Sequence, residues 1–291
     1  SNITMVVPLR LVDLIEIDDG WEVKAESPDG TNQEIITGSV VLATNGFGAN
    51  AERVARHIPE VVDGLYFGGD HSLGDALEIG ERLGADVGFL DSYQGHGSVA
   101  TPHGVLITWT AMMNGAFLVN ANGQRFGDET TGYSEFAVKV IAQPESRAWM
   151  IYDKAVHEKA LPFADYQQMV ESGGIRWTDD VAGLASLIGC DEATISATLE
   201  GIATFGSSAA VDPLGRTLWP HDLEPPFTAI KVTGALFHTQ GGLSVNEHAN
   251  VLRGGKTIPG LYAAGGAAIG ISGNGASGYL SGNGLLGALG L

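Results

Sequence analysis

The chain has 291 residues, of which 44% are hydrophobic and 17% are charged, a balance typical of a globular protein and not of a disordered one. With 34 acidic and 15 basic residues the net charge is −19, which argues against binding to nucleic acid or to an anionic membrane surface. Cys190 is the single cysteine, so an internal disulfide and a cysteine metal site are excluded.

The chain starts at Ser1-Asn2 without a Met, and no secretory signal pattern follows. We read this start as an added remnant or an internal cut, and we expect a cytoplasmic protein. The eight histidines are scattered without the H-x-x-x-H spacing of a metal site. We therefore expect no metal.

The predicted elements alternate between strand and helix patterns along the chain. In chain order they are strands within 5–47, helices at 51–58 and 73–85, short strands after Tyr93, helices near 133–142, 151–159 and 163–172, two helices capped by Thr178 and Asp191, and strands again from Phe227. This order predicts an α/β protein in three parts. Residues 1–92 and 231–291 form an outer nucleotide-binding domain, and residues 93–230 form an inserted α+β substrate cap.

The stretch "VVLATNGFGANAERV" at residues 40–54 joins an apolar strand to a glycine turn and a helix. Its continuous apolar run is typical of a parallel strand covered on both faces. Gly46-x-Gly48-x-x-Ala51 also satisfies the loose dinucleotide fingerprint. That fingerprint needs an acidic residue about 20 positions further on, where this chain has Gly68. The stretch is therefore a poor match to a first-unit dinucleotide loop.

The last 35 residues, 257–291, carry no charge. An uncharged segment of that length could span a membrane. Its many glycines, together with Asn274 and Asn283, instead favour a buried segment that cradles a ligand.

Several motifs in chain order resemble those of the fumarate reductase/succinate dehydrogenase-like flavoproteins, a family that includes the 3-ketosteroid dehydrogenases. "VVLATNGFG" resembles the second glycine motif of the family, and "GAFLVNANGQRFGDE" resembles its G-x-R-F-x-x-E hairpin. "PPFTAIKVTGALFHTQGGLSVN" and "IPGLYAAGGAAIGISGNGASGYLSGNGLL" resemble its C-terminal flavin motifs. The family's N-terminal strand–GxGxxG–helix is absent. The resemblance implies a partial FAD-binding Rossmann-like domain with the inserted cap, and a missing N-terminal half of the FAD domain as a partner.

The resemblance also implies which residues contact FAD. They lie at the end of the first apolar strand and in the glycine-rich tail, where backbone amides approach a cofactor closely. They are Ala43, Thr44, Gly46, Gly265, Gly266, Leu280, Ser281 and Asn283. Gly266 stands where many relatives have Glu. Residues 280–284 are expected to start the final helix, whose N-terminal amides would face the flavin.

The resemblance further implies the substrate site. His96, Thr108 and His238 match substrate-binding residues of the fumarate reductases. Tyr133 stands at the position of their proton-donating Arg, and Tyr279 at that of their carboxylate-clamping Arg. Because Tyr does not bind a carboxylate bidentately as Arg does, a dicarboxylate substrate is not expected.

Two more positions of the fumarate reductase proton relay, a Glu and a second Arg, are replaced by Trp109 and Met112. "RFGDETTGYSEF" resembles the ketosteroid dehydrogenase pattern R-F-x-N-E-x-x-x-Y-x-x-F, in which the Tyr helps to remove a substrate proton. The Tyr of that family's C-terminal motif falls at Ala276, three residues before Tyr279.

We therefore expect an FAD-dependent oxidoreductase that acts on a C–C bond of a small molecule next to a carbonyl. Tyr133, His96 and His238 are the predicted catalytic residues, and Thr108 and Tyr279 the predicted substrate contacts. Two alternatives stay open. One is an apo fragment or degenerate binding module without activity, and the other is a fumarate-reductase-like reduction of an unsaturated acid.

Overall fold

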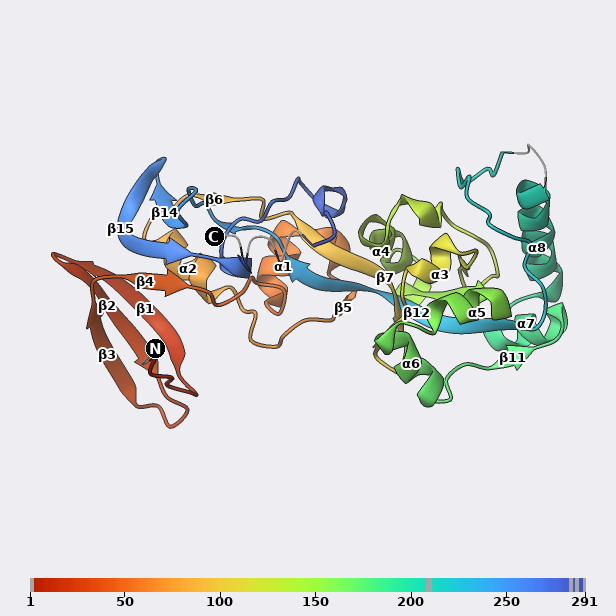
Figure 1. Cartoon of the computed structure of the whole chain (residues 1–291), viewed down its shortest axis with the longest axis horizontal. Helices are drawn as coiled ribbons and strands as arrows, with labels where there is room; N and C mark the ends of the chain where they lie inside the picture. Colours follow the sequence, from red (N-terminus) through yellow and green to blue (C-terminus); the bar gives the residue numbers. More distant parts are fainter. Residues whose placement is uncertain (1–2, 208–210, 283–284, 286–287, 290–291) are drawn as a thin grey trace. The chain divides into compact units, whose positions relative to one another are not determined.

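The computed structural model of the chain describes residues 3–207, 211–282, 285, 288 and 289 (Figure 1). The chain divides into two compact units. Unit 1 comprises Ser1–Pro59, Gly68–Gln94 and His238–Leu291, and unit 2 comprises Glu60–Phe67 and Gly95–Phe237. The assignment of residues 1–92, 93–230 and 231–291 to an FAD-binding domain and a cap stays a prediction.

Unit 1 combines small sheets with short helices. Its elements are β1 (Arg10–Ile17), β2 (Gly20–Glu26), β3 (Asn32–Thr37), β4 (Val40–Leu42), α1 (Ala51–His57), α2 (Asp75–Arg82), β6 (Val87–Gly88), β13 (Gly242–Leu243), β14 (Asn250–Arg253) and β15 (Lys256–Ala263). Strands β1, β2 and β3 form an antiparallel sheet, β13 pairs with β6, and β15 lies between β14 and β4.

The core of unit 1 lies between these sheets and α2. Trp21 of β2, Ile79 of α2 and Leu261 of β15 belong to one buried cluster. The Trp21 indole N–H donates to the carbonyl of Pro259 at 3.1 Å, so the β1–β2 hairpin is tied to the start of β15. This core fixes the carboxyl ends of β4 and β15, where the glycine turns begin.

Strand β4 is parallel to β15, with Val41 opposite Tyr262, which confirms the parallel pairing. The prediction that both of its faces are covered is wrong. Leu42 is 1% exposed, but Val41, which points to the other face, is 64% exposed. Alternation along a strand places neighbouring side chains on opposite faces, and only one face of β4 packs on the core.

Unit 2 is built around a mixed seven-stranded sheet. Along its main path the order is β8 (Val105–Leu106), β7 (Tyr93–Ala100), β12 (Phe227–Thr239), β10 (Arg147–Tyr152) and β9 (Phe117–Val119). Strands β11 (Trp177–Thr178) and β5 (Leu65–Tyr66) also pair with β12. The helices are α3 (Thr110–Met113), α4 (Tyr133–Ile141), α5 (Lys154–Ala160), α6 (Ala164–Glu171), α7 (Val181–Ile188) and α8 (Glu192–Ser207).

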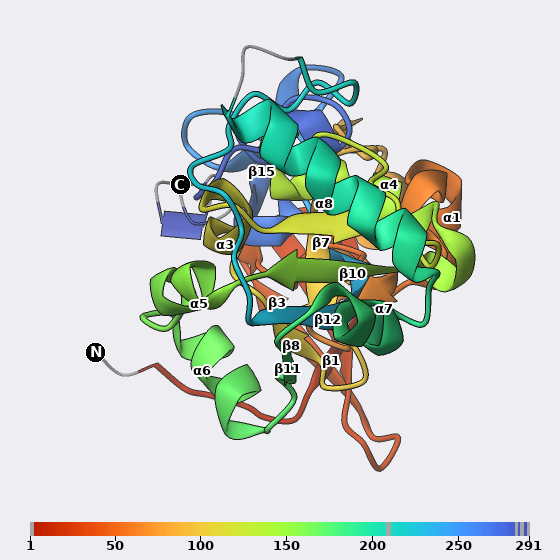
Figure 2. The same cartoon turned by 90° about the vertical axis from the view of Figure 1, so that its right-hand side faces the viewer.

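Strand β10 separates two buried clusters by its alternation. Met150 and Tyr152 point into a cluster that also holds Phe136 of α4 and Val156 of α5. Ile151 points into the other, which holds residues of α7 and α8. Figure 2 looks towards α8, which packs against α7. The sheet of unit 2 is therefore covered by helices on both faces, and the fold is α/β with an α+β part.

Helix positions agree with the sequence patterns, but one predicted cap is wrong. Asp191 caps α8 as expected, since its Oδ2 accepts from the Thr194 N–H at 3.0 Å. The cap of α7 is Asp180, whose Oδ1 accepts from the Gly183 N–H at 2.7 Å. Thr178, the predicted cap, ends β11. Both residue types cap helices well, and the extra strand moves the start of the helix by two residues.

No helix in the described part of the chain has the length and apolar character needed to cross a membrane. The tail is less buried than predicted. Ile258 and Leu261 of β15 are buried, but Ile271 is 63% and Leu280 is 64% exposed. A cytoplasmic location stays a prediction.

Candidate active site

The carboxyl ends of the parallel strands β4 and β15 lie next to each other and lead into glycine turns. Leu42 of β4 pairs with Ala263 of β15, and the Ala264 N–H donates to the Leu42 carbonyl at 3.0 Å. Chain turns at the carboxyl ends of parallel strands are where open α/β sheets bind ligands. The cradle, meaning residues 43–47 and 264–268, forms at this edge.

Two glycines of the cradle are required by close backbone approach. A Cβ on Gly46 would lie 2.1 Å from Thr239 Oγ1, and a Cβ on Gly266 would lie 2.3 Å from Asn45 Oδ1 and 2.9 Å from the Gly46 nitrogen. A side chain at Gly46 would displace Thr239 of β12, and one at Gly266 would push its turn away from Asn45. Gly265 has φ +61°, a conformation that favours glycine, and is otherwise uncrowded.

Asn45 holds the turn after β4 in a left-handed conformation, with φ 66°. Its Oδ1 accepts from the Gly46 N–H at 2.9 Å, and its Nδ2 donates to Ser72 Oγ at 2.9 Å. Asn tolerates this conformation because its side chain bonds the local backbone. Asn45 was not predicted as a site residue, although the Asn-Gly pair in the sequence is a known signal of such a turn.

Ala43 and Thr44, both predicted to contact FAD, do not line the pocket to which Asn45 belongs. The Ala43 side chain is exposed. Thr44 Oγ1 accepts from the Ala76 N–H at 3.2 Å and so caps α2, whose own N-cap residue is Gly74. Thr44 lines a separate cavity of about 730 Å³ together with residues of the N-terminal segment, such as Pro8 and Arg10.

A pocket of about 460 Å³ opens beside the cradle. It is lined by Asn45, Gly265 and Gly266 of the cradle, by His238, Thr239 and Gln240 at the end of β12, and by Tyr279. Its other lining residues include Ala268, Gly270 and Leu285. No Asp, Glu, Lys or Arg of the described chain lines it. The pocket therefore suits an uncharged group held by backbone and amide contacts.

His238 and Tyr279 meet in this pocket. Their rings are 6.1 Å apart in an edge-to-face arrangement. Gln240 Nε2 lies 3.1 Å from His238 Nδ1, and Gln240 Oε1 accepts from Ser272 Oγ at 3.0 Å. Partial burial lowers the pKa of His238, with a smaller opposing effect of the Thr239 carbonyl. His238 is therefore neutral at pH 7.

The other predicted FAD contacts in the tail are Leu280, Ser281 and Asn283. Leu280 and Ser281 are exposed in a turn after Tyr279 and do not line the pocket. Gly282, which follows with φ +87°, does line it. Asn283 lies outside the described residues.

His96 of β7 lies in an aromatic cluster of unit 2 and is 5% exposed. Its ring stacks on Tyr133 at 5.0 Å and on Phe237 at 5.4 Å, and it meets Trp109 edge-on at 5.5 Å. Burial lowers the pKa of His96 to about 3, so the ring is neutral at physiological pH. Such a ring binds by hydrogen bonding and packing, not by charge.

The other residues of unit 2 that the sequence analysis named lie on or next to helices α3 and α4. Tyr133 begins α4, directly after Gly132 with φ 128°. Thr108 Oγ1 accepts from the Thr110 N–H at 3.3 Å, so it supports the start of α3. Trp109 donates its indole N–H to the Glu129 carbonyl at 3.1 Å, and Met112 is fully buried. Trp109 and Met112 therefore both belong to the apolar interior of unit 2.

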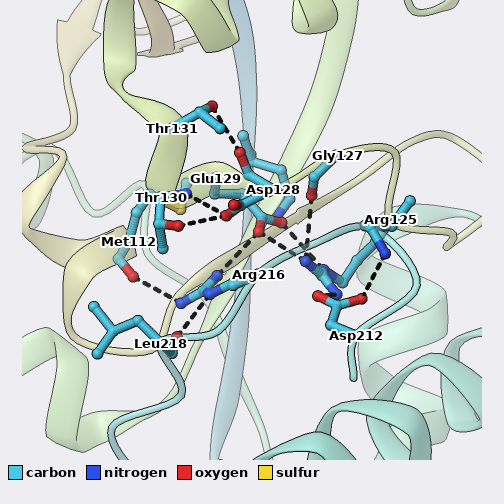
Figure 3. A network of polar contacts seen from close by, with 12 residues as sticks. Met112, Arg125, Gly127, Asp128, Glu129, Thr130, Thr131, Asp212, Arg216 and Leu218 are labelled. Atoms are coloured by element: carbon cyan, nitrogen blue, oxygen red, sulfur yellow. Dashed lines mark hydrogen bonds and ion pairs between the residues drawn. The ribbon is translucent and has the colours of Figure 1, made fainter. Parts of the chain in front are cut away.

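The R-F-x-x-E motif forms a buried charge network (Figure 3). Glu129 Oε2 accepts from Arg125 Nη2 at 3.0 Å and from Arg216 Nη1 at 3.1 Å. Arg125 Nη1 donates to Asp212 Oδ2 at 2.7 Å. Two positive and two negative side chains therefore balance, with Glu129, Asp212 and Arg216 side chains at 0% exposure.

Arg216 is held at every nitrogen. Its Nε donates to the Leu218 carbonyl at 2.9 Å, its Nη1 to Ala116 at 2.8 Å and its Nη2 to Met112 at 2.8 Å. Burial lowers the pKa of Arg216, and the Glu129 carboxylate opposes this. Burial also acts against the charge of Arg125, but Glu129 and Asp212 outweigh it and raise the pKa of Arg125. Arg216 was not predicted, because nothing near it in the sequence marks it as part of the motif.

The structure thus brings the predicted residues together in two sets. His238, Tyr279, Gly265 and Gly266 line the pocket of unit 1, and His96 and Tyr133 stack in unit 2 beside Trp109, which follows Thr108. Sequence reasoning missed Asn45, Gln240 and the stacking partner Phe237. In the described chain, no group of three or more His, Cys, Asp or Glu side chains could hold a metal ion.

Known proteins resemble this chain along most of its length. A family profile described as "FAD binding domain" matches residues 10–285. A probable fumarate reductase of Shewanella frigidimarina is 32% identical over 239 residues, which cover 81% of this chain and 40% of that protein. The chain thus spans about two-fifths of the length of this relative.

Solved structures share the fold. An open conformation of a flavocytochrome c3 fumarate reductase has a TM-score of 0.79 and 28% identity, and the match covers 96% of this chain and 49% of that one. A 3-ketosteroid Δ4-(5α)-dehydrogenase of Rhodococcus jostii, solved with 4-androstene-3,17-dione, has a TM-score of 0.68 and 24% identity. That match covers 96% of this chain and 56% of the dehydrogenase, and it speaks for the fold alone.

The residues of the cradle fit part of an FAD molecule. Gly265 and Gly266 line the pocket with backbone alone, and Asn45 and Gln240 add amide groups to an uncharged lining. Asn45, Gly265, Gly266 and Gln240 are the residues that would hold the cofactor there. With the family profile spanning residues 10–285, the chain belongs to the fumarate reductase/succinate dehydrogenase-like family of FAD flavoproteins, and its cofactor is FAD.

Proposed function

We propose that the protein is an FAD-dependent oxidoreductase that acts on a C–C bond next to a carbonyl group of a small, largely uncharged molecule. The observation that carries the proposal is the aromatic cluster around His96. Tyr133, Phe237 and Trp109 surround this ring, and among the described residues no arginine forms a hydrogen bond or ion pair with it. When bound, FAD supplies the exchange of a hydride with a substrate carbon.

The charge network supports an uncharged substrate. A carboxylate is recognised best by a free Arg that binds it bidentately. Arg125 and Arg216 are buried in unit 2, and both are already paired with Glu129 or Asp212. The positions at which the fumarate reductases carry their proton-donating and clamping Arg are Tyr133 and Tyr279 in this chain. A fumarate-like dicarboxylate would find no free guanidinium at any of these four positions.

Tyr133 is the proposed proton-transfer residue. It stands at the Tyr of the pattern that "RFGDETTGYSEF" shares with the ketosteroid dehydrogenases. His96 lies against its ring at 5.0 Å and fixes its orientation by stacking. Within unit 2, His96 and Thr108 are the proposed contacts for polar groups of the substrate. Within unit 1, His238 and Tyr279 are the proposed substrate contacts.

A second candidate is the reduction of an unsaturated organic acid. It is favoured by the similarity to the fumarate reductase and by the resemblance that predicts His96, Thr108 and His238 as substrate-binding residues. A third is an apo fragment or a degenerate binding module without catalytic activity. Because the chain spans about two-fifths of that relative, we also propose that further protein completes the FAD cradle.

The first experiment is a visible absorption spectrum of the purified chain with added FAD after gel filtration. Retained flavin absorbance supports the cradle, and its complete loss would favour the module without activity. Turnover is then compared for 4-androstene-3,17-dione and 2-cyclohexen-1-one, with an artificial electron acceptor or reduced flavin, and for fumarate. Activity on fumarate alone would replace the proposal by the second candidate.

Substitutions test the residue roles. Tyr133→Phe should retain FAD but lose about 10²- to 10⁴-fold in kcat, the usual range for a lost acid–base group. Tyr262→Phe, in β15, is the matched control and should keep its kcat. Wild-type turnover in Tyr133→Phe would exclude the proton role, and an unchanged KM in His238→Ala would exclude the binding role.

A further inference from the structure

We propose that Ser98 fixes the tautomer of His96, so that the ring offers the lone pair of Nε2 to a ligand. It follows that the group bound by His96 is a hydrogen-bond donor, such as a hydroxyl or an N–H, and not a carbonyl or carboxylate oxygen. The substrate half of this inference rests on the proposed function. The tautomer itself is a property of the chain alone.

The argument begins with the hydroxyl proton of Ser98. Ser98 Oγ lies 2.8 Å from the Ile107 carbonyl oxygen, and a carbonyl oxygen can only accept. The single hydroxyl proton of Ser98 is therefore used in that bond. Ser98 Oγ also lies 3.1 Å from His96 Nδ1. With its proton engaged, the hydroxyl can only accept there, and His96 Nδ1 must carry the donated proton.

The backbone holds this arrangement in place. Ile107 N–H donates to the Ser98 carbonyl at 3.0 Å, so Ser98 and Ile107 face each other across the pairing of β7 and β8. Both residues are 0% exposed. The opposite tautomer would need the hydroxyl to turn to Nδ1 and abandon the Ile107 carbonyl. A buried neutral hydrogen bond favours the observed arrangement by about two- to tenfold.

His96 is neutral, so the location of its one proton decides its role. Its ring is packed between Tyr133 and Phe237, and burial holds its pKa at about 3. Within the part of the chain that the structure describes, no hydrogen bond reaches Nε2. With Nδ1–H committed to Ser98, Nε2 is an acceptor only.

This assigns a chemical class to the bound group. An Nε2 lone pair attracts a donor and repels the lone pairs of a ketone or carboxylate oxygen. A substrate held at His96 therefore carries a hydroxyl or N–H in addition to its reacting carbonyl. Ser98 acts as a positioning residue, since it sets what His96 recognises without contacting the substrate.

The direct test is NMR of the full chain labelled with ¹⁵N-histidine at pH 7, with the His96 signals assigned through His96→Gln. Wild type should show the Nδ1–H tautomer. Ser98→Ala should move the equilibrium towards Nε2–H, because the acceptor for Nδ1–H is gone. Ser98→Thr keeps a hydroxyl and should show the wild-type His96 signals. It serves as the second variant in case Ser98→Ala folds poorly. Ser172→Ala, whose hydroxyl bonds Met169 elsewhere in unit 2, is the control.

An Nε2–H tautomer in wild type, or identical His96 signals in Ser98→Ala, would overturn the inference. Neither result depends on FAD or turnover, so the proposed function is judged separately. In the active enzyme, 4-hydroxy-2-cyclohexen-1-one should have a lower KM than 2-cyclohexen-1-one. Ser98→Ala should reduce that preference about five- to tenfold with little change in kcat. An unchanged preference would refute the substrate class even with the tautomer established.

Discussion

The cradle of unit 1 and the charge network of unit 2 are both family motifs, yet they are built in opposite ways. In the cradle the essential atoms belong to the backbone, and Gly46 and Gly266 matter because they lack side chains. In the network the essential atoms are four charged side chains, and Glu129 is surrounded by Arg125 and Arg216 with no solvent contact. One motif lets neighbouring segments of the chain pack closely beside an uncharged pocket. The other closes space and holds the fold of unit 2.

The largest expected effect comes from breaking the network. Glu129→Gln should lower the free energy of unfolding by about 3–5 kcal/mol, because it leaves two buried guanidinium groups with one carboxylate between them. Urea unfolding measures the change. Glu171→Gln, an exposed residue at the end of α6, should change it by less than about 0.5 kcal/mol. A loss below about 1 kcal/mol for Glu129→Gln would mean that the network contributes little.

Adding one methyl group at Gly46 should disrupt the cradle. Gly46→Ala places a Cβ against Thr239 Oγ1 and should cost about 1–3 kcal/mol of stability, as overpacking does. It should also weaken FAD retention on gel filtration. Gly38→Ala is the matched control, because a Cβ there meets nothing within 4 Å. Equal FAD retention in both variants would argue against the cradle as a cofactor site.

The histidines of the two regions should differ in their response to pH. The pKa of His96 is about 3 in the folded chain, and about 6.5 is usual for the unfolded one. Below pH 6.5 the unfolded chain therefore binds a proton that the folded chain does not. Stability should fall by up to about 1.4 kcal/mol per pH unit as the pH decreases from 6 to 4.

His96→Gln should remove that part of the slope, measured by urea unfolding at several pH values. His238→Gln should remove less of it, since the pKa of His238 is lowered but its ring is less buried than that of His96. The exposed His248→Gln serves as the control. An identical slope in His96→Gln and wild type would contradict the burial effect.

The smallest effect should come from the aromatic face of the network. The Trp219 ring lies 4.0 Å from the Arg216 guanidinium carbon and 4.7 Å from that of Arg125. Trp219→Leu should cost about 1 kcal/mol in cation–π attraction, measured as a shift in the unfolding midpoint. A loss as large as that of Glu129→Gln would mean that packing, and not charge pairing, holds the network together.

Motif order and strand pattern predicted the family, the parallel pairing of β4 and the helices of unit 2. They did so because glycine turns, caps and apolar periodicity are local properties of the sequence. Residues that act across long separations could not be found in this way. Arg216 reaches Glu129 across 87 positions, and Phe237 reaches His96 across more than a hundred. Local patterns also placed the α7 cap at Thr178, because they did not include the strand that takes up that residue.

The limits of local sequence patterns also explain which predicted FAD contacts the structure places at the pocket. Gly46, Gly265 and Gly266 were predicted, and the structure places the last two at the pocket. Thr44 was predicted at the cofactor but its hydroxyl is used to cap α2. A sequence match marks a position in the chain. It does not say whether the side chain there points to a ligand or to the protein.

The buried hydrogen bonds and ion pair of Arg216 stabilise the chain segment around it. Residues 211–226 contain Pro213, Pro220, Pro225 and Pro226 and form no helix or strand, features associated with exchange-labile, protease-sensitive linkers. Yet Arg216 is bonded to three carbonyls from two other segments and its own, and Asp212 to Arg125. Opening this stretch would expose a balanced set of buried ions. It should therefore open together with the body of unit 2 as one cooperative unit, and its stability should be that of the whole unit and not that of a loop.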